Sequence, residues 1–554
     1  MTPAFSFTTH DVENQPEIMS PYNLWSCDNL LKAAVKLNGG QHAEQLLENY
    51  GHEVGHQLMD AGEQANRHKP IFQPFDRYGR RTDTVEFHPA YHELMAAAMK
   101  SQVHAYSWRN PSQAGAHVVR AALLFMHYQA DAGTSCPLTM THAAVAVLKQ
   151  SPNLPAFWTQ KLINGEYDPR ALPAEQKRGL TLGMGMTEKQ GGSDVRRNTT
   201  QAIKQPDGNY HIVGHKFFFS APLCDAHLIL AQTENGLSCF LLPRILPDGQ
   251  LNQVRIQRLK DKLGDWSNAS SEVEFQGATA YLVGEEGQGV KLIIDMVSLT
   301  RLDCMIGSTA LMRQALVQAL HHTQHRVAFG AKLIDQPLMK NVLADLTLEV
   351  SASLALTMRV AKAVDLASTN RHEAGLSRIA TAIGKYWICK RAPAFANEAQ
   401  ECLGGIGYVE ENIMPRLYRQ APLNSIWEGS ANVQCLDVLR ALRKEPEVKT
   451  ALFDELNTAV GKNNAYDSHI KTLITAFDEQ ETLEVRSRLV IEQMALALQG
   501  ALLLNAEDQQ MAEAFCQTRL DKQQGLVFGT LPPSVPFDEI IKRGMLKSYT
   551  NSIK

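Results

Sequence analysis

The spacing of apolar residues changes twice along the chain, and this change constrains the fold more than any other feature. Within 181–287, apolar runs of strand length alternate with tight-turn dipeptides, which is typical of antiparallel β structure. The turns are Asp207-Gly208, Asn235-Gly236 and Asp248-Gly249, and the runs include 211–213, 217–219, 228–231 and 239–242. Beyond 288 a helical period returns, with Leu346, Val350, Leu354 and Met358 recurring every four residues. We therefore predict a β domain between helical domains.

The length of the chain sets the number of domains. A chain of 554 residues is too long for one hydrophobic core. We predict an α+β fold that is mainly α, in four parts: an N-terminal extension and helical domain (1–180), a middle antiparallel β domain (181–287), a helical bundle (288–445) and an extra C-terminal helical domain (446–554). The first hundred residues are expected to be irregular with some helix. The first clear helix signal has Asn110 as its cap and Pro111 in its first turn.

Charge and cysteine usage argue against several classes of function. The formal charge is 54 − 58 = −4, so the whole-chain balance predicts neither nucleic acid nor an anionic membrane as a partner. The nine cysteines form no C-x-x-C pair, which is typical of reduced thiols in a cytoplasmic protein. The first residues lack a signal-peptide pattern, and the apolar stretch 489–504 looks too short and too polar for a membrane span. We expect a cytoplasmic location, no membrane contact and a buried helix at 489–504.

One short motif suggests a metal site. His52-Glu53-Val54-Gly55-His56 matches H-E-x-x-H, which on a helix places two imidazoles on one face where they could hold zinc. Such a site needs a third ligand, and the extended form with a further G-x-x-H is absent. Gly55 also weakens the helix that must present the pair. We expect an ordinary polar helix face and no metal.

Two other segments carry residues suited to chemistry. Met184 to Asp194 is rich in small and hydroxyl residues, and such a loop can offer backbone N–H groups to a polar ring edge or a phosphate, although many such loops are only turns. In Ser425 to Ala431, Glu428 lies between Trp427 and Gly429. The indole could exclude water and raise the pKa of this carboxyl, as a general base requires. The alternative is an ordinary carboxylate at a helix N-terminus.

Six motifs in order resemble those of the acyl-CoA dehydrogenase family. The resemblance spans about 110–445 and rests on Met186-Thr-Glu…Gly-Ser-Asp194, Gly214-His-Lys-Phe-Phe-Phe-Ser220, Gly284-Glu-Glu-Gly-Gln-Gly289 followed by Arg301, Arg326-Val-Ala-Phe-Gly330 with Gln336, Leu403-Gly-Gly-Ile-Gly-Tyr408, and Ile426-Trp-Glu-Gly-Ser430. Each motif alone is weak, but their shared order is specific. The resemblance implies FAD as cofactor, an acyl-CoA as substrate, and Glu428 as the base that removes the α-proton.

The resemblance also implies a role for each matching residue. Met186, Thr187, Phe218 and Ser220 would contact the flavin ring, and Arg326, Phe329 and Gln336 would reach the FAD of a neighbouring subunit. Gly404, Gly405, Ser430 and Asn432 would line the dinucleotide. The full set expected at the cofactor is Met184, Met186, Thr187, Gly192, Ser193, Phe218, Phe219, Ser220, Arg326, Phe329, Gln336, Gly404, Gly405, Trp427, Gly429, Ser430 and Asn432. The set expected at the substrate is Thr187, Ser193, Ser220, Arg301 and Glu428.

The chain departs from the family pattern at several positions. In one branch of the family the base lies beside the residue that matches Arg301, but here Thr300 and Leu302 flank that arginine and Asp303 is offset, so Glu428 keeps the role. Phe218 stands where tryptophan is usual, and Glu401 stands where glutamine is expected. Asp265-Trp266 stands where the family has arginine. These changes affect details of the dinucleotide contacts.

The extension at each end resembles the branch of the family linked to the bacterial response to DNA alkylation. That resemblance implies a homotetrameric flavoprotein, electron-transfer flavoprotein or a similar acceptor as a partner, and an alternative role in which the protein binds double-stranded DNA and its dehydrogenase activity is vestigial. Residues 441–554 hold 13 basic and 16 acidic residues, which is not a basic domain. Local patches remain candidates, at Arg440, at Arg486 with Arg488, or at Lys542 with Arg543 and Lys547. Neither the acyl chain nor the physiological acceptor can be predicted.

Overall fold

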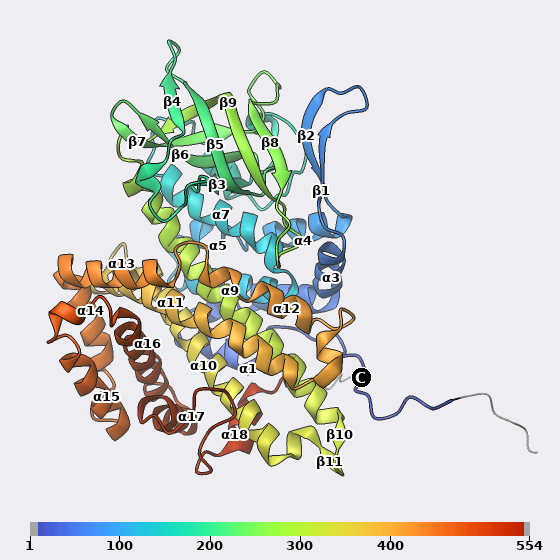
Figure 1. The fold of residues 1–554 in the computed structure, drawn as a ribbon, viewed down its shortest axis with the longest axis vertical. Coiled ribbons are helices and arrows are strands. Elements are labelled where there is room, and N and C mark those ends of the chain that lie inside the picture. Colours follow the sequence, from blue (N-terminus) through green and yellow to red (C-terminus); the bar gives the residue numbers. More distant parts are fainter. Residues whose placement is uncertain (1–8, 548–554) are drawn as a thin grey trace, which may run out of the picture.

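The structure is a computed structural model that describes residues 9–547. A β body lies at one end of the elongated molecule and helices fill the rest (Figure 1). The elements before the β body are α1 (Asn29–Leu37), α2 (Glu44–Glu53), a π-helical turn (Val54–Leu58), α3 (Met59–Arg67), β1 (Ile71–Phe75), β2 (Arg81–Glu86), α4 (Pro89–Lys100), α5 (Tyr106–Arg109), α6 (Ala116–Ala130), α7 (Ala132–Leu148) and α8 (Phe157–Leu162).

Two predictions about this N-terminal part were wrong. The first hundred residues are not irregular, because four helices and a hairpin fill them, and the turn-rich stretch 76–80 is the tip of that hairpin. Asn110 does not cap the N-terminus of a helix but follows the end of α5 as its C-cap. Its amide nitrogen donates back to Tyr106 O at 2.8 Å and closes α5, while α6 begins at Ala116 after the left-handed Gly115. An asparagine side chain can hydrogen-bond to the backbone at either end of a helix, so the sequence alone did not show which end Asn110 marks.

The β body is a seven-stranded sheet that closes on itself. Its strands are β3 (Leu182–Gly185), β4 (Gln201–Lys204), β5 (Tyr210–Ser220), β6 (Ala226–Thr233), β7 (Gly236–Pro243), β8 (Val254–Leu259) and β9 (Ser270–Val283). The order is β3-β6-β4-β5-β9-β7 with β8 on β9, and a further β6–β7 pairing closes the sheet. Only the pairings of β6 with β3 and β4 are parallel. The predicted antiparallel β structure is confirmed, and the runs 211–213 and 217–219 lie in one strand, β5.

Long helices follow the β body. They are α9 (Gly289–His325), α10 (Pro337–Leu366), α11 (Arg371–Glu401), α12 (Met414–Gln420) and α13 (Ala431–Lys444), with the short strands β10 (Val327–Ala328) and β11 (Ala331–Lys332) between α9 and α10. The predicted stripe on α10 is fully buried, since Leu346, Val350, Leu354 and Met358 are each at most 1% exposed. Packing of long apolar faces therefore stabilises this bundle.

The C-terminal helices pack against the bundle. They are α14 (Pro446–Asn457), α15 (Asn464–Thr475), α16 (Ser487–Leu504), α17 (Gln509–Phe515) and α18 (Phe537–Gly544). Contrary to expectation, α16 is long and apolar enough to cross a membrane by length and composition alone, but 72% of it is buried inside the structure. It contacts α10, α11, α13 and the other tail helices, so the expected buried helix is confirmed. Arg519 anchors the tail by a buried ion pair with Asp345 of α10.

Candidate active site

Glu428 lies on a strained turn between α12 and α13. Its φ is +58° and that of Gly429 is +97°. A left-handed conformation disfavours a residue with a Cβ by about 1–2 kcal/mol, so the surroundings must hold it in place. They do so through three consecutive carbonyl groups. Lys385 Nζ of α11 donates to Trp427 O at 2.8 Å and to Gly429 O, and Gln434 Nε2 donates to Glu428 O and Gly429 O at 3.0 and 2.9 Å.

Arg301 of α9 completes this arrangement. Its Nε donates to Glu428 O at 3.0 Å, and its Nη1 forms an ion pair with Asp437 of α13 at 2.7 Å. Arg378 of α11 binds the same Asp437 carboxylate at 2.8 Å. With the three carbonyl oxygens turned to these donors, the backbone N–H of Glu428 meets no acceptor among residues 9–547. The turn therefore presents one carboxylate and one free amide donor together.

The Glu428 carboxylate is half-buried, and one hydroxyl group contacts it directly. Thr300 Oγ1 donates to Glu428 Oε2 at 2.7 Å. Burial raises the pKa of Glu428, while the Thr300 hydrogen bond and the charges of Arg301 and Lys385 partly oppose that rise. Trp427 is held beside it because its indole N–H donates to Asn424 Oδ1 at 2.9 Å. A carboxyl group with these properties suits a proton acceptor that works near neutral pH.

Asp303 is unavailable as an alternative base. It is 3% exposed and forms a two-pronged ion pair with the equally buried Arg120 of α6, with Nη2 to Oδ2 at 2.7 Å. Thr300 and Leu302, the neighbours of Arg301, carry no group that could accept a proton at neutral pH. Glu428 is therefore the carboxylate that this turn presents.

A buried ion pair joins the two sequence motifs of the β body. Lys216 Nζ of β5 lies 2.8 Å from Glu188 Oε1, and both side chains are fully buried. Thr199 and Thr200 also donate to this carboxylate through their backbone N–H groups, at 2.7 and 3.2 Å. These partners hold the pKa of Glu188 down at about 2, against the opposing effect of burial. The loop that begins at Met184 is thus fixed to the strand that ends at Ser220.

The residues predicted at the flavin differ in how exposed they are in this part of the structure. Phe218 is 50% exposed, and Gly192 and Ser193 lie on the surface loop. Phe219 is 1% exposed and stacks on His227, with ring centroids 3.8 Å apart, so its side chain belongs to the core of the sheet. Met184, Met186 and Trp427 pack against one shared apolar cluster, which brings the loop and the Glu428 turn together. Thr187 and Ser220 are half-buried.

A second group of predicted residues lies far from Glu428. Arg326 follows the end of α9, and 25 residues of helix at 1.5 Å each separate it from Arg301 by about 37 Å. Phe329 is fully exposed at the tip of the β10–β11 turn, at the opposite end of the molecule from the β body (Figure 1). Gln336 Nε2 donates to Ala328 O at 2.9 Å and supports that turn. These three residues cannot contact a flavin ring at Glu428 of their own chain.

The remaining predicted residues lie on exposed loops and helix ends. Gly404 and Gly405 follow α11, and a Cβ atom at either position would meet nothing within 4 Å. Ser430 is the N-cap of α13 but makes no side-chain capping bond, which leaves the first amides of that helix without a capping side chain. Asn432 is exposed and accepts from Arg488 Nε of α16 at 2.8 Å.

Two further sequence features have structural explanations. The π-helical turn at 54–58 carries the second histidine of the H-E-x-x-H motif, and the rings of His52 and His56 stack 4.0 Å apart. In the described part of the chain no group of three potential ligands forms around them. Asp265, the first residue of the Asp265-Trp266 pair that stands where the family has arginine, is 2% exposed at φ +52°. Trp266 beside it lies between the cations of Lys69 and Arg419, at 3.9 and 4.1 Å.

Sequence reasoning missed the residues that hold the turn. Lys385, Gln434 and Asp437 carry no motif of their own, and Lys385 is 43 residues away from Glu428 in the chain. Thr300 was considered only as a position that lacks a base, whereas its hydroxyl binds the carboxylate. The sequence offered one signal for Thr300, which is its position next to Arg301.

Comparisons with known proteins agree with this geometry. Three family models match: the adaptive response protein AidB N-terminal domain (residues 14–169), the acyl-CoA dehydrogenase middle domain (183–278) and the acyl-CoA dehydrogenase C-terminal domain (287–443). The putative acyl-CoA dehydrogenase AidB of Escherichia coli (strain K12) is 46% identical over 522 residues, which cover 94% of this chain and 96% of that protein. Acyl-CoA dehydrogenase family member 11 of Caenorhabditis elegans is 29% identical over 471 residues, which cover 82% of this chain and 75% of that protein.

A solved structure shows the same architecture over nearly the whole chain. The crystal structure of Caenorhabditis elegans ACDH-11 in complex with C11-CoA superposes with a TM-score of 0.86 at 25% identity, covering 93% of this chain and 94% of that chain. The likeness therefore includes the N-terminal helices, the β body, the bundle and the tail. The chain belongs to the acyl-CoA dehydrogenase family of oxidoreductases, in its AidB-type branch.

Proposed function

We propose that the protein is an FAD-dependent dehydrogenase of acyl-CoA thioesters in which Glu428 removes the proton from the carbon next to the thioester. One observation carries the proposal. A half-buried carboxylate of raised pKa and a free backbone N–H belong to the same residue, and three side chains hold that residue in a strained turn. The amide can donate to the thioester carbonyl, which acidifies the α-proton, while the carboxylate accepts that proton.

Residues of the chain fit the two chemical parts of FAD. The planar ring would lie against Phe218, an aromatic side chain that is 50% exposed, and against Met186, Thr187 and Ser220. The pyrophosphate fits the start of α13, where the helix dipole and uncapped amides favour negative charge. Bound FAD supplies the acceptor for the hydride that leaves the β-carbon. The chain itself positions the thioester, excludes water with Trp427 and holds the proton on Glu428.

The distance between the two groups of predicted residues supports an oligomer. Arg326 lies about 37 Å along α9 from Arg301, which contacts the Glu428 turn, and Phe329 and Gln336 follow beyond the end of that helix, so the three residues serve an FAD only if that FAD belongs to a second copy. This supports a homo-oligomer, for which we propose the tetramer implied by the family resemblance. An acyl-CoA is the proposed substrate, in line with the C11-CoA complex of ACDH-11. Electron-transfer flavoprotein or a similar protein is the proposed acceptor.

The test compares the wild type with Glu428→Gln, which keeps the size of the side chain and removes the base. Each purified protein, loaded with FAD, is mixed anaerobically with a panel of acyl-CoAs while the flavin absorbance is followed. We expect bleaching in the wild type and bleaching slowed by several orders of magnitude in the variant. A variant that bleaches as fast as the wild type would remove Glu428 from the role, and a wild type that no thioester bleaches would refute the dehydrogenase.

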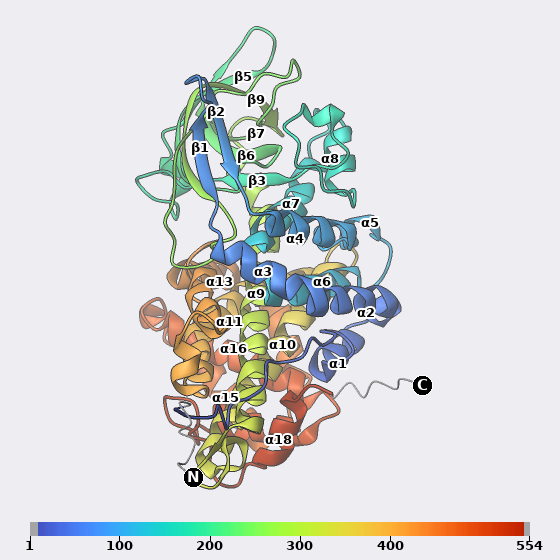
Figure 2. The ribbon, with the colours of Figure 1, turned by 90° about the vertical axis from the view of Figure 1, so that its right-hand side faces the viewer.

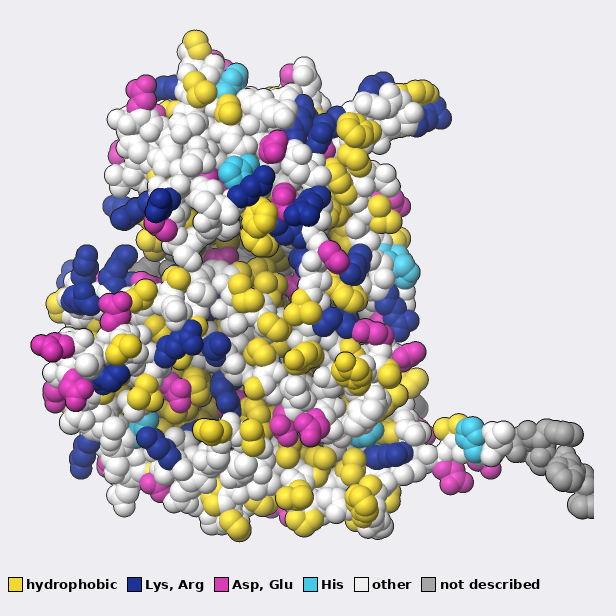
Figure 3. Space-filling view, in the orientation of Figure 1, with side chains coloured by type: hydrophobic (Ala, Val, Ile, Leu, Met, Phe, Trp, Pro, Cys, Tyr) yellow, Lys and Arg dark blue, Asp and Glu magenta, His cyan; other side chains and the backbone are white. Residues whose placement is uncertain are grey.

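Binding of double-stranded DNA is the second candidate function, and one surface favours it. Arg440, Arg443 and Lys444 at the end of α13 are exposed and make no ion pair within residues 9–547, and Lys and Arg side chains gather there in Figure 3. The other predicted patches are largely engaged, since Arg486 binds its own loop and Arg543 binds Asp508 and Glu539. Phosphate contacts would make affinity fall steeply with salt. Replacing all three α13 cations with glutamine should flatten that salt dependence, and unchanged binding would exclude this surface.

A further inference from the structure

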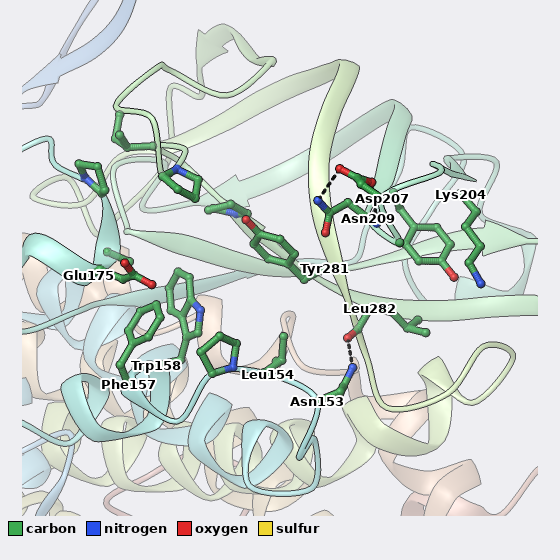
Figure 4. Close-up of a pocket in the computed structure, with 18 residues that line it drawn as sticks. Asn153, Leu154, Phe157, Trp158, Glu175, Lys204, Asp207, Asn209, Tyr281 and Leu282 are labelled. Carbon is green, nitrogen blue, oxygen red and sulfur yellow. Dashed lines mark hydrogen bonds between the residues drawn. The ribbon is translucent and has the colours of Figure 1, made fainter.

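One cavity in the described part of the chain lies away from Glu428. The segment that contains α8 lies beside the β body (Figure 2), and the cavity between them has a volume of about 520 Å³ (Figure 4). Residues 153–158 and 173–175 form one side, and the β4–β5 turn, the segment after β7 and the end of β9 form the other. None of the residues placed at the proposed cofactor or substrate lines it. Its size is that of a small-molecule site, so the residues on its walls indicate what it can hold.

Aromatic and proline side chains form the walls. Phe157 and Trp158 stack with ring centroids 5.2 Å apart, and the Tyr281 ring of β9 faces them across the cavity (Figure 4). Four prolines complete the apolar lining: Pro155, Pro173, Pro243 and Pro247. Asn153 Nδ2 donates to Leu282 O at 3.0 Å and ties the two sides together. The cavity therefore presents flat π surfaces on two opposite walls, held by rigid neighbours.

The charged residues on the lining are two carboxylates and one lysine: Glu175, Asp207 and Lys204. Glu175 is exposed, and its carboxylate forms neither an ion pair nor a hydrogen bond in the described part of the chain. Asp207 lies at the rim, where its oxygens accept from Asn209. Burial and the negative charges of Glu175 and Asp207 raise the pKa of Tyr281. The only lysine on the lining, Lys204, points away from the aromatic rings in Figure 4.

We propose that this cavity binds an organic ammonium ion, with its charge between the Glu175 carboxylate and the faces of Trp158 and Tyr281. A cation gains both from a carboxylate and from the negative face of an aromatic ring, and a partly desolvated site strengthens both interactions. The alkyl groups of such a ligand would contact the prolines. An anion would meet two carboxylates and no opposing cation directed into the cavity. A neutral ligand of the same shape would lose the electrostatic part of the binding energy.

The test uses choline and its neutral isostere 3,3-dimethylbutan-1-ol as probes of the FAD-loaded, full-length protein in isothermal titration calorimetry. We expect saturable binding of choline and, for the isostere, affinity lower by about tenfold, as the size of a cation–π contact implies. Glu175→Gln should weaken choline binding by a similar factor, and Tyr281→Leu should weaken it as well. Glu234→Gln, which removes an exposed carboxylate outside the cavity, should bind like the wild type.

Three results would overturn the proposal: no saturable binding of choline, equal affinity for the isostere, or unchanged choline binding in Glu175→Gln. Thermal unfolding shows whether each variant is folded, and a loss of binding counts only in a folded variant. Glu175 is exposed, so Glu175→Gln should fold normally and is the deciding variant. The result is independent of Glu428, because Glu428→Gln should leave choline binding unchanged.

Discussion

Replacing Thr300 with valine tests how the proton affinity of Glu428 is set. The hydroxyl donates to Glu428 Oε2 at 2.7 Å, and valine has the same shape without the donor. A hydrogen bond to a charged group contributes about 1.5–3 kcal/mol, and one pKa unit corresponds to about 1.4 kcal/mol. Because this hydrogen bond stabilises the ionised form, its loss should raise the pKa of Glu428 by about one to two units. The base would then be protonated at pH values where it is ionised in the wild type.

The pH dependence of flavin bleaching by an acyl-CoA measures this shift. In the wild type the rate should rise with pH as Glu428 loses its proton, and in Thr300→Val the same limb should lie about one to two units higher. At high pH the two rates should converge, because both carboxylates are then ionised. Thr300→Ser keeps the donor and should match the wild type.

A competing arrangement of the proton gives the opposite sign. Thr300 Oγ1 also lies 3.0 Å from Val297 O, and one hydroxyl proton cannot serve two acceptors fully. If the proton goes to Val297 O, a protonated Glu428 donates to Thr300, and the valine variant loses a contact of the neutral acid. The limb would then move to lower pH. A downward shift or no shift would refute the reasoning. Ser298→Ala, which removes a hydroxyl bound only to Ile294 O, is the matched control.

Three further predictions concern buried charges. Burial raises the pKa of Asp265 from 3.8 to about 7, so its folded form keeps a proton that the unfolded chain loses, and stability falls as pH rises from about 4 to 7. Asparagine tolerates the left-handed backbone, so Asp265→Asn should remove this loss of stability. Its free energy of unfolding in urea should exceed that of the wild type by up to about 4 kcal/mol at pH 8 but by little at pH 4. If the free energies of the two proteins change in parallel with pH, the prediction is wrong. Lys216→Met should lower the free energy of unfolding by about 3–5 kcal/mol, because it leaves the Glu188 charge buried and unpaired. Adding Glu188→Gln should recover part of that loss. If the losses of the two single variants simply add in the double variant, the two residues do not act as a pair. Arg519→Met should destabilise the protein by a similar amount through Asp345, and a change below about 1 kcal/mol in thermal unfolding would show that the tail is held by apolar contacts alone.

Periodicity was sufficient to predict the order of the domains. The four-residue recurrence on α10 and the turn dipeptides of the β body depend on local backbone geometry, which neighbouring residues determine. The N-terminal hundred residues failed the same reasoning because their helices are short, with 9 to 12 residues each. The hairpin at 71–86 depends on pairing between its strands, and Phe75 and Ile71 are more than half exposed, so no alternation marks it.

The motifs predicted which residues cluster, but not how they are held. From the residues alone, Ile426 to Ser430 left two interpretations of Glu428 open, a positioned base beside Trp427 or an ordinary carboxylate at a helix N-terminus, and the family resemblance selected the base. The sequence could not show that Lys385, Arg301 and Gln434 would hold three carbonyl groups. Those residues come from separate helices, and only the packing of α9, α11 and α13 brings their donors to one turn.

The sequence alone therefore determined the order of the helical and β domains after the first hundred residues, the family motifs and the choice of Glu428 as the proposed base. These features depend on short-range periodicity and on residue types that one chemistry requires. Tertiary structure alone decided the proton affinity of Glu428, the burial of Phe219, the separation of Arg326 from the base, and the cavity at Trp158. Each of these depends on distances between residues far apart in the chain, and burial and electrostatic energy follow from those distances rather than from residue type.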